Sequence, residues 1–161
     1  MGQEFRNMRR FKQQVPDEEC IAILKEQWRG VLSLLGDNGY PYGVPIDYFY
    51  DEETGKIYFH GAREGHKIDA VKACEKASFC VWNEGFRKEG DWALNITSVI
   101  VFGRIHIVED RDRNIEIARK IALKYYPDAE GAEEEVRKAG NRVTCLEMQV
   151  EHMTGKLVNE S

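Results

Sequence analysis

The sequence lacks the features that an exported or membrane-inserted protein needs. None of its apolar runs approaches the roughly 20 residues of a membrane-spanning helix, and the opening stretch MGQEFRNMRRFKQQ has no apolar core of a signal peptide. The cysteines are few and far apart, without a C-x-x-C pair: Cys20, Cys74, Cys80 and Cys145. We therefore expect reduced thiols, no association with a membrane and a cytoplasmic location.

The sequence also lacks an excess of positive charge. It has 23 lysines and arginines against 28 acidic residues, a formal net charge of -5, so no broad basic field is available to hold a nucleic acid. No group of His, Cys, Asp and Glu has the spacing of a metal site, and Ser98 has no G-x-S-x-G context. These absences argue against nucleic acid as a partner and against a resident metal.

The apolar residues that are present recur mostly with the period of two that is typical of β-strands. Six strands are predicted, mostly linked as hairpins and without a repeated βαβ order, which favours a mainly β fold: a small antiparallel β-barrel with flanking helices. Gly103, in the middle of a long strand, indicates a bulge or bend. The predicted strands span residues 31–35, 42–50, 56–60, 77–82, 98–108 and 142–150, and the predicted helices span 16–28, 66–76, 112–126 and 132–140.

The length of 161 residues fits one compact core and hardly two. We therefore predict a single domain over residues 1–161, in which residues 1–14 form a flexible N-terminal arm. The polar, glycine-bearing stretch 83–95 contains Trp92 and is predicted to be a mobile loop.

The stretch KIYFHGAREGHKID, residues 56–69, passes from a strand through small residues into a helix. The first turn of a helix offers unpaired backbone N–H groups and the positive end of the helix dipole, which suit an anion. Lys67 and Arg63 could add charge there, and Gly61 and Gly65 would let the backbone approach a phosphate closely. An ordinary exposed loop that enters an amphipathic helix is an equally good interpretation of this stretch alone.

The preceding strand, residues 42–50, carries Gly43 and Pro45 on one face. Because proline has no N–H, this strand is expected to have an unpaired or bulged part that could meet a planar ligand. Aromatic walls for such a ligand could come from Tyr42, Tyr48, Phe59 and Trp92. The alternative is that most of these aromatic residues pack in the core.

The array GYPYGVPIDYFYDEETGKIYFHGAREGHKIDAV, residues 39–71, resembles the signature region of the pyridoxamine 5'-phosphate oxidase-like, FMN-binding split-barrel superfamily. The order P-Y-x-V-P followed by I-Y-F-H-x-A-x-x-G-x-K is most similar to the nitroimidazole-resistance branch. The resemblance implies a homodimer of split barrels that binds two FMN molecules at the subunit interface.

The resemblance also implies roles for particular residues. The backbone around Gly43, Val44, Pro45 and Ile46 would line the isoalloxazine ring, and His60, Gly61, Ala62 and Lys67 would surround the ribityl phosphate. Ser98 would be a further polar contact, and Trp92 could cover the ring of its own or the partner's flavin. His60 is the candidate for a catalytic residue, because it is a titratable group beside the expected flavin, and its alternative role is a structural hydrogen bond.

The function that the resemblance implies is that of an FMN-dependent oxidoreductase. It would pass electrons from a reduced nicotinamide to a small organic acceptor such as a nitroaromatic compound. The sequence shows no counterpart of the arginine-rich substrate site of the true pyridoxamine 5'-phosphate oxidases, so oxidation of vitamin B6 is not predicted. The alternatives are a non-catalytic flavin-binding module and a member of the superfamily that uses heme or a deazaflavin.

Overall fold

The strands form one antiparallel sheet in the computed structural model, which describes residues 5–159. Seven strands follow the order β3-β2-β6-β7-β8-β5-β4, and the short β1 pairs with β8. The strands are β1 (Gln14–Val15), β2 (Arg29–Leu35), β3 (Pro41–Asp47), β4 (Phe49–Asp51), β5 (Lys56–Gly61), β6 (Lys76–Trp82), β7 (Asn95–Ile107) and β8 (Thr144–Asn159).

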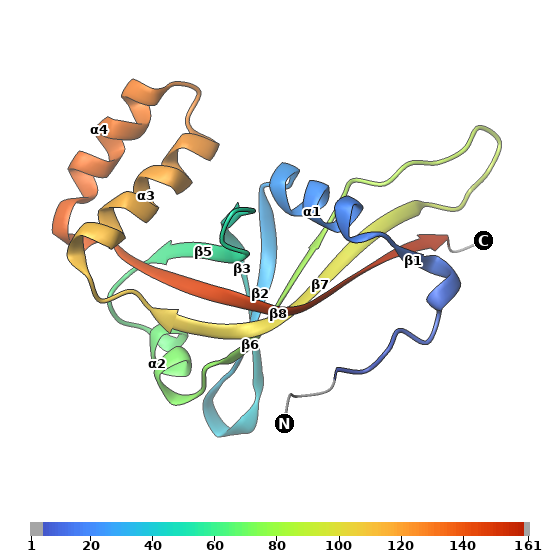
Figure 1. The fold of residues 1–161 in the computed structure, drawn as a ribbon, viewed down its shortest axis with the longest axis horizontal. Coiled ribbons are helices and arrows are strands. Elements are labelled where there is room, and N and C mark those ends of the chain that lie inside the picture. Colours follow the sequence, from blue (N-terminus) through green and yellow to red (C-terminus); the bar gives the residue numbers. More distant parts are fainter. Residues whose placement is uncertain (1–4, 160–161) are drawn as a thin grey trace.

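The sheet curls because its two end strands, β3 and β4, are separated by Tyr48 alone. Tyr48 is fully buried, and its hydroxyl donates a hydrogen bond of 2.6 Å to the carbonyl oxygen of Leu24. Figure 1 shows the resulting curved sheet, which is open on one side. The predicted antiparallel split β-barrel is therefore confirmed.

The predicted number of strands was too low. The run 42–50 was expected to be one strand, but pairing changes at Tyr48, where β3 leaves β2 and β4 begins to pair with β5. Strand β1 was also missed because only two residues, Gln14 and Val15, pair with β8 there. Both differences arise from pairing between segments that are distant in the sequence, which a local pattern does not report.

Four α-helices flank the sheet, and all four agree with the predicted helices within a few residues. Figure 1 shows α3 and α4 side by side at one end of the sheet, with the loop 83–94 at the opposite end. In the described range 5–159, no helix is long and apolar enough to cross a membrane. The helices are α1 (Asp17–Glu26), α2 (His66–Ala73), α3 (Arg111–Tyr125) and α4 (Ala129–Ala139), with 3-10 turns at Phe11–Gln13, Asp37–Gly39 and Gly140–Arg142.

The bulge predicted at Gly103 is present. The pairing register between β7 and β8 shifts between Phe102 and Gly103. A Cβ atom on Gly103 would lie 2.1 Å from the carbonyl oxygen of Gln149, so only glycine allows the two backbones to approach this closely.

The N-terminal arm was predicted over residues 1–14, of which 1–4 lie outside the described residues. In the described part, the Phe5 ring stacks on His152 with ring centroids 4.7 Å apart, and Phe11–Gln13 form a 3-10 turn. Gln14 already belongs to β1. The flexibility of this arm and the single-domain organisation stay predictions.

Candidate functional site

Lys67 lies in the first turn of α2, which a short connection, residues 62–65, joins to the end of β5. Gly65 precedes the helix with a positive φ of 129°, a conformation that favours glycine. Lys67 forms no hydrogen bond or ion pair within residues 5–159. Burial lowers the pKa of Lys67 from its ordinary value of 10.5. The junction of β5 and α2 therefore presents a partly buried ammonium group that no carboxylate of the described residues neutralises.

Gly61 provides the room for this ammonium group. A Cβ atom on Gly61 would lie only 2.7 Å from Lys67 Nζ. Ala62 and Gly65, which follow between β5 and α2, are exposed. The predicted phosphate-binding residues Gly61, Ala62 and Lys67 are thus together in space, next to His60 on β5.

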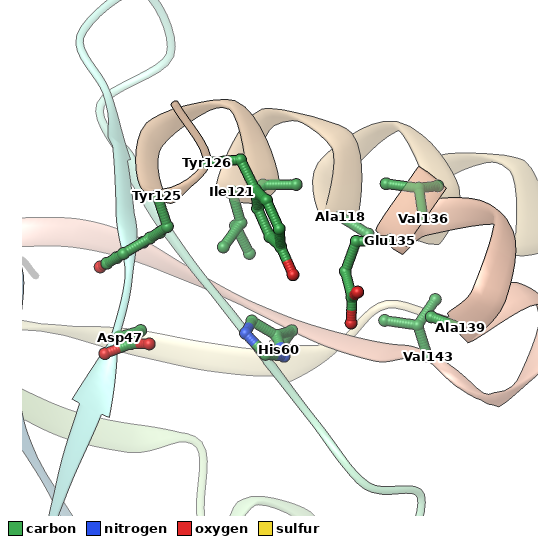
Figure 2. A pocket seen from close by; sticks show the side chains of 11 residues that line it. Asp47, His60, Ala118, Ile121, Tyr125, Tyr126, Glu135, Val136, Ala139 and Val143 are labelled. Atoms are coloured by element: carbon green, nitrogen blue, oxygen red, sulfur yellow. The ribbon is translucent and has the colours of Figure 1, made fainter. Parts of the chain in front are cut away.

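His60 lines a cavity of about 280 Å³ between β3, β5 and the pair of helices α3 and α4. Figure 2 shows the imidazole on one side of the cavity, with Tyr126 and Glu135 pointing toward it from the helices and Asp47 beside it. His60 forms no hydrogen bond within residues 5–159, so the structure offers no protein partner for the alternative structural role. Apolar side chains of α3 and α4, such as Ile121 and Val136, complete the wall.

The electrostatic surroundings of His60 favour the neutral imidazole. Partial desolvation in the cavity and the positive charge of Lys67 lower the pKa of His60 from 6.5, although the residue stays exposed to solvent, while Asp47 and Glu135 act in the opposite direction. The carboxylate of Asp47 is itself 3.4 Å from Arg29 Nε, which weakens its effect. At neutral pH, His60 can therefore both accept and donate a hydrogen bond in the cavity.

Strand β3 forms one edge of the sheet, and its free edge faces the β5 side of the split. It pairs with β2 over its whole length without a register shift, so the expected bulge is absent from β3 and only its outer edge is unpaired. Gly43 and Pro45 are exposed, whereas Val44 is half-buried and Ile46 is buried in the core. Any contact of Ile46 with a ligand is therefore limited to its backbone.

Of the four aromatic residues that could form walls, Tyr48 and Phe59 follow the alternative and pack in the core. Tyr48 and Phe59 are fully buried and pack edge-on against Phe79 in the core. Tyr42 is half-buried and stacks on His66 of α2, with ring centroids 4.0 Å apart. This stack ties the start of β3 to the start of α2, so the two predicted halves of the flavin site are adjacent.

Ser98 and Trp92 lie at the other end of the molecule. Ser98 pairs with Lys156 of β8, whereas His60 pairs with Cys145 of the same strand, a separation of roughly 35 Å of strand length. Trp92 is 72% exposed on the loop 83–94. One chain therefore does not bring these two residues to the Lys67 end of the sheet.

Sequence reasoning missed three residues that share the cavity with His60: Asp47, Tyr126 and Glu135. The alternation of residues 42–50 places Asp47 on the same face as Gly43 and Pro45, and this signal could have identified it. Tyr126 and Glu135 had no such signal, because they reach His60 only through the packing of α3 and α4 onto β5.

The sequence matches the family described as pyridoxamine 5'-phosphate oxidase over residues 16–157, which is most of the chain. No curated protein is similar enough to the chain to be matched to it.

Solved structures share the fold at low sequence identity. A candidate 5-nitroimidazole antibiotic resistance protein from Bacteroides thetaiotaomicron is 17% identical, with a TM-score of 0.75 over 91% of this chain and 87% of that chain. A FAD-binding protein from Mesorhizobium loti is 22% identical, with a TM-score of 0.63 over 90% and 96% of the two chains. A flavocytochrome from Azotobacter vinelandii is 17% identical, with a TM-score of 0.74 over 94% and 72%.

The fold of these structures and the match over residues 16–157 agree with the resemblance seen in residues 39–71. The chain belongs to the pyridoxamine 5'-phosphate oxidase family.

Proposed function

We propose that the chain is an FMN-binding oxidoreductase that reduces a small organic acceptor, such as a nitroaromatic compound, with electrons from a reduced nicotinamide. The observation that carries the proposal is the ammonium group of Lys67, which is partly buried beside Gly61 and has no counterion among residues 5–159. A buried charge without a partner is costly, and a phosphate dianion would supply the missing partner. The residues present therefore fit a flavin mononucleotide.

The phosphate would be held by Lys67 and by the exposed backbone between Gly61 and Gly65. The ring would lie along the free edge of β3, where the backbone of residues 43–46 has no neighbouring strand on one side. Bound flavin supplies hydride and electron transfer, while the protein supplies binding and orientation.

The cavity beside His60 would hold the acceptor. Its volume of about 280 Å³ is at the lower end of the range for small-molecule sites, so it suits a single substituted ring better than a whole flavin nucleotide. The apolar side chains of α3 and α4 would cover the ring, and neutral His60 would hydrogen-bond to its polar substituent. In this position His60 is the candidate catalytic residue.

The second proposal is a homodimer with the flavin at its interface. Large apolar side chains are exposed on the outer face of β6 and β7: Trp82 at 46%, Ile100 at 42% and Phe102 at 41%. An exposed apolar patch of this kind is typical of a protein interface. The N-terminal arm packs against Phe102 on this face and leaves these side chains partly exposed. A second copy seated beside the arm could bring its own Ser98 and Trp92 to the Lys67 end of the first, which one chain alone does not achieve.

Steady-state turnover distinguishes this function from its alternatives. Protein loaded with FMN should oxidise NADH or NADPH faster than free FMN when a nitroaromatic acceptor is present. A protein that binds FMN without such turnover would be the non-catalytic module, and a visible spectrum of heme or of a deazaflavin would identify the other alternative. His60→Asn should lower turnover and leave FMN affinity within a few-fold of the wild type, because its place is in the acceptor cavity.

A further inference from the structure

A second cavity lies under the N-terminal arm, on the outer face of β7 and β8. It encloses about 300 Å³ between arm residues 6–9 and the sheet. The stacking of Phe5 on His152 and on Phe102 fixes the arm over this face. The cavity is separate from Lys67. Its floor includes Ser98 of β7, which pairs with Lys156 near the end of β8, whereas β5 pairs with the beginning of β8.

Among residues 5–159, the charged side chains that line this cavity are all basic. Arg6 and Arg9 line it from the arm and Lys156 lines it from β8, and no aspartate or glutamate of that range does so. None of the three side chains forms an ion pair or hydrogen bond within residues 5–159.

Arginines of the sheet and of α3, in contrast, form ion pairs with carboxylates. Arg29 pairs with Asp47, Arg104 with Glu75 and Arg119 with Glu133. Arg6, Arg9 and Lys156 therefore gather three positive charges at one place on an acidic chain with a net charge of -5. Such a cluster raises the local concentration of anions.

The lining also contains the polar side chains of His152, Ser98 and Thr154 and the apolar side chains of Met8, Ile100 and Phe102. His152 Nε2 is buried and has no hydrogen-bond partner in the described part of the chain. The residues Ser98 and Thr154, which also line the cavity, carry hydroxyl groups that can donate to an anion.

We propose that this cavity is a second phosphate-binding site, which takes a phosphate or diphosphate group of a nucleotide. Arg6, Arg9 and Lys156 supply the positive charge, and Ser98 and Thr154 supply neutral donors. Binding of the anion follows from these residues alone. Its assignment to a nucleotide rests on the proposed oxidoreductase function, which offers two sources: the tail of the flavin held by a second copy of the chain, or the reduced nicotinamide donor.

Binding of inorganic pyrophosphate, measured by calorimetry at low ionic strength with the full chain, tests the site itself. Pyrophosphate should still bind to the Lys67→Ala variant, and combining this change with Arg6→Gln and Arg9→Gln should weaken binding at least tenfold. Lys156→Gln tests the same site from the sheet and should act in the same direction. Arg10→Gln is the matched control, since Arg10 lies on the same arm outside this cavity and should leave binding unchanged.

Three results would overturn the proposal: no binding of pyrophosphate, loss of all binding in Lys67→Ala, or an equal effect of Arg10→Gln. The source is assigned by two further measurements on Arg6→Gln/Arg9→Gln. If the affinity for FMN falls and the KM for NADPH is unchanged, the anion belongs to the flavin. If the KM for NADPH rises and the affinity for FMN is unchanged, the anion belongs to the nicotinamide donor. If neither quantity changes, the assignment to a nucleotide is overturned. Failure of flavin binding in the wild type would refute the proposed function and leave the pyrophosphate result standing.

Discussion

The replacement of Lys67 by alanine is the most informative single change in the proposed flavin site. The side chain has no hydrogen-bond or ion-pair partner in the part of the chain that the structure describes, so its removal leaves no other group there without a hydrogen bond. A charge-assisted hydrogen bond to phosphate contributes about 1.5 to 3 kcal/mol. We therefore expect the Kd for FMN to rise by about 10- to 150-fold, as measured by quenching of flavin fluorescence.

The same structure predicts that this replacement does not destabilise the protein without ligand. Burial lowers the pKa of Lys67, which means that the folded chain disfavours its charged form. Removing the ammonium group should leave the melting temperature unchanged or slightly raised. Exposed Lys72, on the same helix, provides the matched control, because Lys72→Ala should leave FMN affinity unchanged.

Riboflavin lacks the phosphate, so a comparison of FMN with riboflavin measures the contact between Lys67 and the phosphate alone. Lys67→Ala should weaken the binding of FMN and leave the binding of riboflavin as it is. An equal loss for both ligands, or an unchanged Kd for FMN, would refute the reasoning that Lys67 holds the phosphate.

Three further predictions test the surroundings of this site. Gly61→Ala should weaken FMN binding several-fold with little effect on thermal stability, because its Cβ would lie 2.7 Å from the movable end of Lys67. Tyr48→Phe should lower the free energy of unfolding in urea by about 1 to 3 kcal/mol, since it leaves a buried carbonyl without its donor; an unchanged midpoint would contradict this. The pKa of His60, measured by NMR, should lie below 6.5; Glu135→Gln should lower this pKa further and Lys67→Ala should raise it toward 6.5. Because this folded-state pKa lies below the unfolded value, His60 should cost stability as the pH falls below 6.5, and a pKa above 6.5 in the ligand-free protein would contradict the account.

The sequence was sufficient for those parts of the fold that depend on local patterns. Alternation predicted the six main strand segments, and the helical period of residues 112–126 predicted α3. The division at Tyr48 was not predictable from alternation, because its side chain continues the inward pattern of β3 while the backbone changes partner. Partner strands, and not the residue itself, decide where pairing ends.

The candidate site also has a part that the local sequence predicts and a part that depends on tertiary packing. Gly61 and Lys67 are six residues apart on one turn from strand to helix, so their proximity follows from the local sequence. The meeting of His60 with Glu135 and Tyr126 depends on how α3 and α4 fold back over β5, and no pattern in either segment encodes it. Ser98 was expected beside the flavin, but the pairing of β7 with β8 places it at the far end of the same chain.

The visible absorbance of the protein, measured after FMN is added and the unbound flavin is removed by gel filtration, tests the central claim most directly. The account predicts a retained flavin spectrum at about one FMN per chain. A colourless protein with no flavin absorbance would contradict it.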